Sequence, residues 1–207
     1  MNLVEKIKEL HASKYKFVIV SSGGGSNAIA SLLKVPGASN TVLEAYIPYA
    51  KESLDFYLMK KPDFYASKDT SLRMAARAYS AAKKIDQESS LNHLLGVSIT
   101  ASLSTTYEKR GDHKFHIALQ TRDFSKSISC KLEKGTRTRE EEEELVTAFV
   151  VNLLAECSEL KYDYPKIPEE VVFDEVKAEK GWAELMSNKI NYVLSEDVSP
   201  ELIFPGA

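Results

Sequence analysis

The strongest constraint on the fold is the stretch from residue 17 to residue 39, where an apolar run leads directly into a glycine cluster. Residues 17–20, FVIV, are typical of a buried strand. Gly23, Gly24 and Gly25 allow positive φ angles and a close approach of the backbone. Residues 26–34 have helical spacing, so the free amides and dipole of a helix N-terminus should favour an anion or a developing oxyanion there. Ser26 and Asn27 are the capping candidates for this helix.

The charge balance and composition exclude several classes of function. The chain has 207 residues, a net charge of −3 and a pI of about 5.9, which does not favour a nucleic-acid surface. It contains no apolar run long enough for a membrane helix, and its first residues lack the apolar region of a secretory signal. We therefore expect a cytoplasmic protein without a nucleic-acid or membrane partner.

The cysteines and histidines give no indication of a metal site. Cys130 and Cys157 are interpreted as buried, reduced thiols. The four histidines are scattered, and His113 and His116 lie three apart in a predicted strand, which should place them on opposite faces. We predict neither a metal nor a cofactor.

The remaining pattern predicts an α/β fold. Helices are expected over 2–13, 26–34, 51–59, 70–85 and 138–157, and strands over 16–21, 41–49, 94–103, 114–121 and 125–132. The last two strands should form a hairpin, and Thr70 or Ser71 should lie near the cap of the fourth helix. The chain after Leu160 is charged and punctuated by proline, which indicates a linker or a peripheral wrap. A further helix is expected over 180–194.

Two phosphate-binding motifs were compared with the glycine cluster. Gly23, Gly25 and Ala28 fit the dinucleotide pattern G-x-G-x-x-A, with Glu44 about twenty residues further on. However, Glu44 falls inside its strand, and the later chain does not alternate strands and helices. A Walker loop requires Gly-Lys-Ser/Thr after the turn, and Ser26-Asn27 occupies that place, so this motif is excluded.

Ser22 occupies a strand–turn–helix junction like that of a nucleophile elbow, although the pattern G-x-S-x-G is absent because Val20 replaces the first glycine. A nucleophilic serine needs a base, for which Tyr49 and Lys51 are the candidates. The alternative is that Ser22 caps the turn or binds a ligand, while Tyr49 is a core side chain and Lys51 a solvated one. The hydroxyl side chains that follow the next core strand would either line a polar pocket or cap the loop; they are Thr100, Ser102, Ser104 and Thr105.

Residues 15–157 resemble the C-terminal domain of the competence-damage-inducible CinA family, the nicotinamide-nucleotide amidases. The family motif T-A-E-S-C-T-G-G corresponds to residues 19–26, and V-P-G-A-S is identical at residues 35–39. Ser22 falls on the catalytic serine of the family. Tyr49 matches the tyrosine of Y-S-N-x-x-K, but Leu54 replaces its lysine. Thr100 keeps the first residue of T-G-I-A-G-P.

The resemblance implies a three-layer α/β/α sandwich, often dimeric, that hydrolyses nicotinamide mononucleotide to nicotinate mononucleotide and ammonia. It places Ser22, Tyr49 and Lys51 in the catalytic positions, with Lys51 one helical turn before the missing lysine. The predicted ligand-binding residues are Ser21, Gly23, Gly24, Gly25, Ser26, Thr100, Ser102 and Arg137. The last of these stands in Gly135-Thr136-Arg137, where the family has G-D-R.

The chain divides by composition into a CinA-like domain, residues 1–160, and an extension, residues 161–207. The final residues, LIFPGA, resemble the opening strand of nucleotidylyltransferase domains, which would make the extension a lead into a fused domain. The alternative is a C-terminal strand on the sheet of the first domain.

Three functions remain open from the sequence. The first is a divergent CinA-like binding module with a degenerate amidase site, which holds a nucleotide-like or phosphorylated ligand at Ser22–Asn27. The second is an active amidase that uses Ser22, Tyr49 and Lys51. The third is a structural or homodimerising domain without a ligand.

Overall fold

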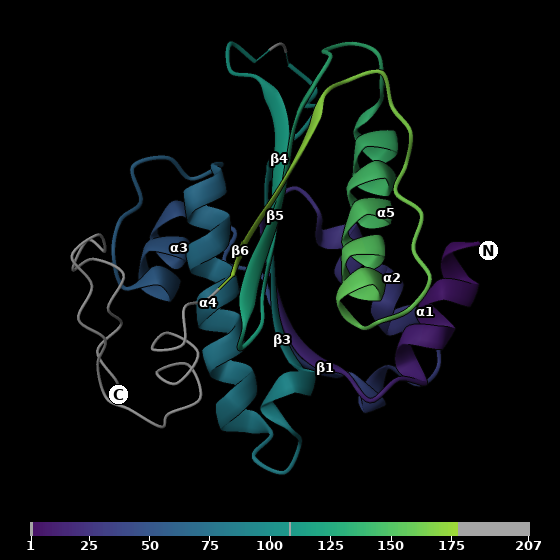
Figure 1. The fold of residues 1–207 in the computed structure, drawn as a ribbon. Helices are drawn as coiled ribbons and strands as arrows, with labels where there is room; N and C mark the ends of the chain where they lie inside the picture. Colours follow the sequence, from purple (N-terminus) through teal and green to yellow (C-terminus); the bar gives the residue numbers. More distant parts are fainter. Residues whose placement is uncertain (1, 108, 178–207) are drawn as a thin grey trace.

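A computed structural model describes residues 2–107 and 109–177 of the chain. A six-stranded mixed sheet, in the order β2-β1-β3-β4-β5-β6, forms its middle layer. Helices α1, α2 and α5 cover one face, and α3 and α4 cover the other (Figure 1). The predicted three-layer α/β/α architecture is therefore confirmed. The predicted helix over 180–194 and the tail that resembles a nucleotidylyltransferase strand lie outside the described residues.

The elements follow the sequence pattern closely. In chain order they are α1 (Leu3–His11), β1 (Lys16–Gly23), α2 (Ser26–Lys34), β2 (Val42–Tyr46), α3 (Lys51–Leu58), α4 (Lys68–Ile85), β3 (Leu94–Ser102), β4 (His113–Gln120), β5 (Phe124–Leu132), α5 (Arg139–Cys157) and β6 (Val171–Lys177). Short 3-10 turns over 38–40 and 91–93 precede β2 and β3. None of the helices in these residues is long and apolar enough to cross a bilayer.

The three parallel strands form the centre of the fold. β1 pairs in parallel with β2 on one side and with β3 on the other. Both central strands are buried on both faces, which explains why their sequences are nearly continuous apolar runs. The chain leaves β1 for the edge through α2 on one face and returns to β3 through α4 on the other. This switch point at the carboxyl end of β1 is where open α/β sheets commonly place ligands.

Two hydrophobic clusters hold the layers together. Phe17 and Ile19 point to the larger one, which includes Phe149 and Leu153 of α5. Val18 and Val20 point to the smaller one, beneath α3 and α4. Cys130 and Cys157 are buried free thiols, as predicted, and burial raises the pKa of the Cys130 thiol to about 11. His113 and His116 point to opposite faces of β4, also as predicted, since they bond to α5 and to β5 respectively.

Two further predictions concern the start of α4 and the chain after Leu160. Thr70 lies near the cap of α4, as predicted, and the cap itself is Ser67, whose hydroxyl accepts the Thr70 amide. The stretch interpreted as a linker or wrap contains β6, which pairs antiparallel with β5 over seven residues. The compositional boundary at residue 160 therefore falls before the sixth strand of the same sheet.

Gly96 fixes the distance between β3 and α4. A Cβ atom there would lie 2.1 Å from the Tyr79 amide nitrogen and 2.2 Å from the Ala75 carbonyl oxygen. We predict that Gly96→Ala lowers the free energy of unfolding by about 1–3 kcal/mol or more, because backbone rather than a flexible side chain must move. Gly111→Ala, which meets nothing within 4 Å, is the control. Urea unfolding of both variants would measure the difference, and equal midpoints would contradict this packing.

Candidate functional site

The glycine turn joins β1 to α2 in a conformation that requires glycine. Gly23 and Gly25 have φ angles of 78° and 96°, which side chains rarely adopt. A Cβ on Gly23 would also lie 2.2 Å from the Ala101 carbonyl oxygen of β3. Gly25 is the N-cap residue of α2 and has no side chain to offer, so the predicted caps Ser26 and Asn27 lie inside the helix instead.

The anion that this helix N-terminus favours comes from the protein itself. One carboxylate oxygen of Glu143, in α5, accepts the Gly25 amide at 2.9 Å and the Asn27 amide at 3.4 Å. The other accepts two guanidinium hydrogen bonds from Arg139, at 3.0 and 3.2 Å. The Asn27 side chain also donates to the Thr147 hydroxyl of α5. The turn therefore binds a carboxylate, and Glu143, which supplies it, lies 118 residues after Gly25 in the sequence.

A shallow groove of about 400 Å³ runs beside this contact, between α2 and α5. Its lining includes three acidic side chains, those of Glu140, Glu143 and Glu144, together with Ser26, Asn27 and Ala30. The amides of the turn favour an anion and the walls of the groove favour a cation. A ligand that carries both charges matches this arrangement better than a simple anion does.

Ser21 and Ser22 lie on opposite faces of the last residues of β1. The Ser22 hydroxyl is buried, with 7% of the residue exposed, and donates to the Pro48 carbonyl at 2.9 Å. The Ser21 hydroxyl donates to the Gly24 carbonyl at 3.1 Å and closes the turn. Both hydroxyl protons are therefore bound to backbone carbonyls, which cannot act as bases.

The two candidate bases do not contact Ser22 in the described structure. Tyr49 is 69% exposed. Lys51, at the start of α3, has its ammonium 5.5 Å from the centre of the Tyr65 ring. Leu54, which the resemblance aligns with the family lysine, is buried in the cluster that contains Val18 and Val20. The Ser22 hydroxyl thus contacts Pro48, just before Tyr49 and the start of α3, but not the polar groups of Tyr49 or Lys51.

Thr100 belongs to a row of polar side chains on four neighbouring strands. The sequence did not indicate this row. Register places Ser22 beside Thr100, Thr100 beside His116, and His116 beside Ser129. Thr100 donates to the Tyr65 carbonyl at 2.7 Å, while His116 Nδ1 shares a hydrogen bond with the Ser129 hydroxyl. Burial, and secondarily Lys114, lowers the pKa of His116 to about 4, so its imidazole is neutral near pH 7. Only the strand register reveals this row.

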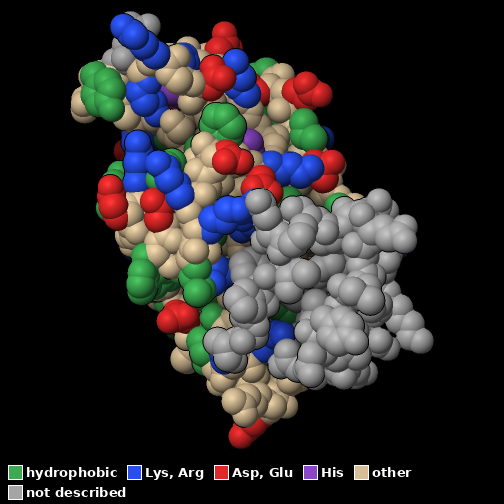
Figure 2. Space-filling model, turned by 90° about the vertical axis from the view of Figure 1, so that its left-hand side faces the viewer, with side chains coloured by type: hydrophobic (Ala, Val, Ile, Leu, Met, Phe, Trp, Pro, Cys, Tyr) green, Lys and Arg blue, Asp and Glu red, His purple; other side chains and the backbone are tan. Residues whose placement is uncertain are grey.

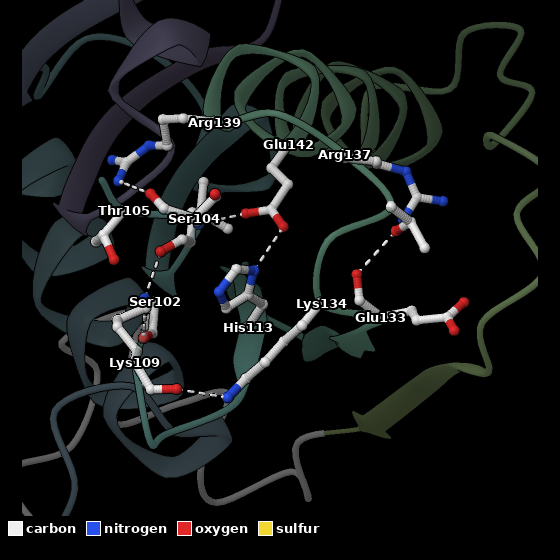
Figure 3. A network of polar contacts seen from close by, with 12 residues as sticks. Ser102, Ser104, Thr105, Lys109, His113, Glu133, Lys134, Arg137, Arg139 and Glu142 are labelled. Carbon is white, nitrogen blue, oxygen red and sulfur yellow. Dashed lines mark hydrogen bonds and ion pairs between the residues drawn. The ribbon is translucent and has the colours of Figure 1, made fainter. Parts of the chain in front are cut away.

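The carboxyl end of β3 carries a second polar group, which Figure 3 shows from close by. Lys109 Nζ lies 3.0 Å from the Ser102 hydroxyl and also donates to the Leu103 carbonyl. Glu142 is fully buried between His113 and the Ser104 amide, at 2.8 and 2.6 Å. Lys109 was not among the predicted site residues, because no sequence periodicity connects it to Ser102.

Arg137 does not join these groups. Its guanidinium forms a bidentate pair with Glu169, just before β6. In Figure 3 it lies on the far side of His113 and Glu142 from Ser102. The position predicted to bind a ligand thus connects the start of α5 to the segment that leads into the sixth strand.

No protein-family model matches the sequence, and no curated protein matches it. Solved structures do match the fold. A competence/damage inducible protein, CihA, from Agrobacterium tumefaciens is 15% identical, with a TM-score of 0.59 over 76% of this chain and 99% of its own. A competence or damage-inducible protein from Enterobacter asburiae is 14% identical, with a TM-score of 0.58 over 75% and 96% of the two chains.

A third structure, the competence damage-inducible protein A (ComA) from Klebsiella pneumoniae, is 12% identical, with a TM-score of 0.57 over 75% and 96% of the two chains. All three matches extend over nearly the full length of the solved protein. This chain therefore has the fold of the competence-damage (CinA) proteins, as the sequence resemblance predicted. At these identities the likeness concerns the fold, and function has to be argued from the site.

The Arg137–Glu169 pair predicts an acid-sensitive contribution to stability. Hydrogen bonds from Arg137 hold the pKa of Glu169 at about 2, below the ordinary glutamate value near 4.5. Because the folded pKa is the lower one, this stabilisation is complete above about pH 4.5 and is lost as the pH falls toward 2. Urea unfolding between pH 7 and pH 2.5 should show a smaller loss of stability in Glu169→Gln than in the parent chain. Glu133→Gln, with an exposed side chain nearby, is the control, and parallel curves for Glu169→Gln would contradict the prediction.

Proposed function

We propose that this chain is a divergent CinA-like domain that binds a nucleotide-like ligand at Ser22–Asn27 without hydrolysing it. The observation that carries the proposal is the contact of Glu143 with the Gly25 and Asn27 amides. In this contact the turn already accommodates a carboxylate oxygen, which supports an anionic ligand. The hydrogen bond from the Ser22 hydroxyl to the Pro48 carbonyl supports the absence of hydrolysis. The phosphate of the ligand would replace the Glu143 carboxylate, which Arg139 could retain.

The groove supports a ligand of mixed charge. Nicotinamide mononucleotide combines a phosphate with a cationic pyridinium ring, and the acidic lining of the groove complements that ring. A phosphate alone would meet three glutamates in the groove, Glu140, Glu143 and Glu144, of which Arg139 pairs only with Glu143. The resemblance to the nicotinamide-nucleotide amidases points to the same class of ligand.

Loss of hydrolysis follows from the separation of the catalytic groups. A serine hydroxyl that donates to a carbonyl is a weak nucleophile, and general-base help is commonly worth about 10²–10⁴-fold in rate. The amides of Gly24, Gly25 and Asn27 are also already donating, to Ala101 and to Glu143, which leaves few donors for an oxyanion.

The test is the addition of nicotinamide mononucleotide to the full chain. We predict no release of ammonia and a rise in melting temperature, because a ligand present at 100 times its Kd stabilises the folded state by about 2.7 kcal/mol. Glu143→Ala should give a larger rise, since the internal competitor is gone. Glu9→Ala, which removes an exposed carboxylate of α1 outside the groove, is the control and should show the same rise as the parent chain.

Two outcomes would overturn the proposal. Ammonia release that disappears in Ser22→Ala would establish the amidase instead. One structural observation favours such activity. Lys51 is exposed and lies three residues after Pro48, whose carbonyl accepts the Ser22 hydroxyl. An unchanged melting temperature in both the parent and Glu143→Ala would exclude binding at the turn.

Homodimerisation is a second candidate role, favoured by exposed apolar side chains in one stretch of chain. Residues 46–64 contribute Phe56, Met59 and Phe64, which are 81%, 72% and 71% exposed. Figure 2 shows the side of the molecule that carries α3 and α4, where hydrophobic side chains lie among charged and other side chains. If these three side chains lie together in a dimer, they would supply the apolar area that marks protein interfaces.

Sedimentation equilibrium checks the dimer. We predict that the parent chain dimerises and that Phe56→Ser with Phe64→Ser shifts it to a monomer, because the substitutions remove apolar area from the contact. Tyr107→Ser, at a side chain 68% exposed elsewhere on the molecule, should leave the dimer intact. A monomeric parent chain would contradict this role.

A further inference from the structure

Ser102 and Lys109 form a pair that neither the glycine turn nor its ligand requires. Ser102 is the last residue of β3, and Lys109 lies in the loop that leads to β4. Their side-chain oxygen and nitrogen are 3.0 Å apart, and both residues are partly buried. A serine within hydrogen-bond distance of a possible base is the basic arrangement of nucleophilic catalysis.

The second contact of Lys109 orients its nitrogen. The Leu103 carbonyl can only accept, so Lys109 must direct one N–H bond toward it. In a neutral amine the lone pair is then left to accept the Ser102 hydroxyl proton. The same geometry is therefore compatible with a neutral Lys109 that acts as a base and with a charged Lys109 that donates to Ser102.

The surroundings of Lys109 favour its neutral amine over its ammonium form, so they lower its pKa. Burial lowers the pKa of Lys109, and the charges of Arg139 and Lys134 lower it further, whereas Glu142 opposes them. Glu142 is itself held by His113 and the Ser104 amide. Figure 3 shows these groups around the pair, with Lys134 donating to the Lys109 carbonyl.

The pair lies at the end of β3 that neighbours the glycine turn, since Gly23 pairs with Ala101. Ser102 follows Thr100 by two residues on β3, so both side chains lie on the sheet face that carries Ser22. It stands at the carboxyl end of the parallel strands, where ligands of open α/β sheets bind. Ser102 is nevertheless distinct from Ser22, whose hydroxyl is held by Pro48.

We propose that Ser102 is a nucleophile activated by Lys109, and that the pair takes acyl groups from carboxylic esters. The Ser102 Oγ forms a bond to the ester carbonyl carbon while its proton passes to Lys109 Nζ. The bond from that carbon to the leaving oxygen then breaks, and the leaving group takes the proton from Lys109. Water attacks the acyl-serine in the same manner and releases the carboxylic acid, which restores Ser102 and neutral Lys109.

To test this proposal, the full chain is treated with p-nitrophenyl acetate. Nitrophenolate release gives the rate of reaction, and peptide mass spectrometry locates the acetyl group. We expect acetylation of Ser102, at a rate that rises with pH as Lys109 loses its proton. Ser102→Ala should abolish labelling at this position. Lys109→Arg can still donate to the Leu103 carbonyl but stays protonated, so it should slow acetylation of Ser102 by about 10²–10⁴-fold.

Matched variants separate this reactivity from other effects. Ser104→Ala removes the neighbouring hydroxyl, and Ser22→Ala removes the serine of the glycine turn; both should keep the Ser102 label. The two proposals can therefore fail separately. Ser102 can be acetylated in a chain that binds no nucleotide, and a chain that binds nucleotide can leave Ser102 unlabelled. Acetyl groups found on surface lysines or on Lys109 with Ser102 unlabelled would overturn the proposal, as would equal labelling of Ser102 in Lys109→Arg.

Discussion

The contact of Glu143 with the amides of the glycine turn joins the two helices that flank the end of β1. The turn exposes amides at the positive end of α2, and burying them without an acceptor would cost about 1–3 kcal/mol each. Glu143 supplies that acceptor from α5, and Arg139 compensates its charge. The positions of α2, of the glycine turn and of the start of α5 therefore depend on one another.

The fold and the chemistry of such a domain depend on different residues. The apolar residues of β1 and β3 hold the sheet and its layers, and Leu54 packs in the core with Val18 and Val20. An anion-binding turn depends on backbone conformation and a general base on a single side chain, so the turn can be present without the base. The Ser102–Lys109 pair shows that the same end of the sheet can bring a serine and an amine together from other positions.

Local patterns predicted most of the elements, because their periodicity reflects burial on one or two faces. The V-P-G-A-S segment pointed to the fold, and its Gly37 has a φ of 101° that favours glycine. β6 escaped prediction because it is an edge strand whose side chains are mostly exposed, so its sequence carries no clear alternation. The role of Glu143 was equally hidden: the run of glutamates from 140 to 144 fits the first turns of any helix, and the partner amides are more than a hundred residues away.

Amide hydrogen exchange at Gly25 and Asn27, measured by NMR, tests the central contact most directly. If Glu143 accepts these two amides, both should be protected in the parent chain and should exchange about tenfold faster in Glu143→Ala, for a loss of about 1.4 kcal/mol. Glu144→Ala, one residue further along α5, should leave both rates unchanged. Equal exchange at Gly25 and Asn27 in the parent and in Glu143→Ala would show that the carboxylate does not fill the turn.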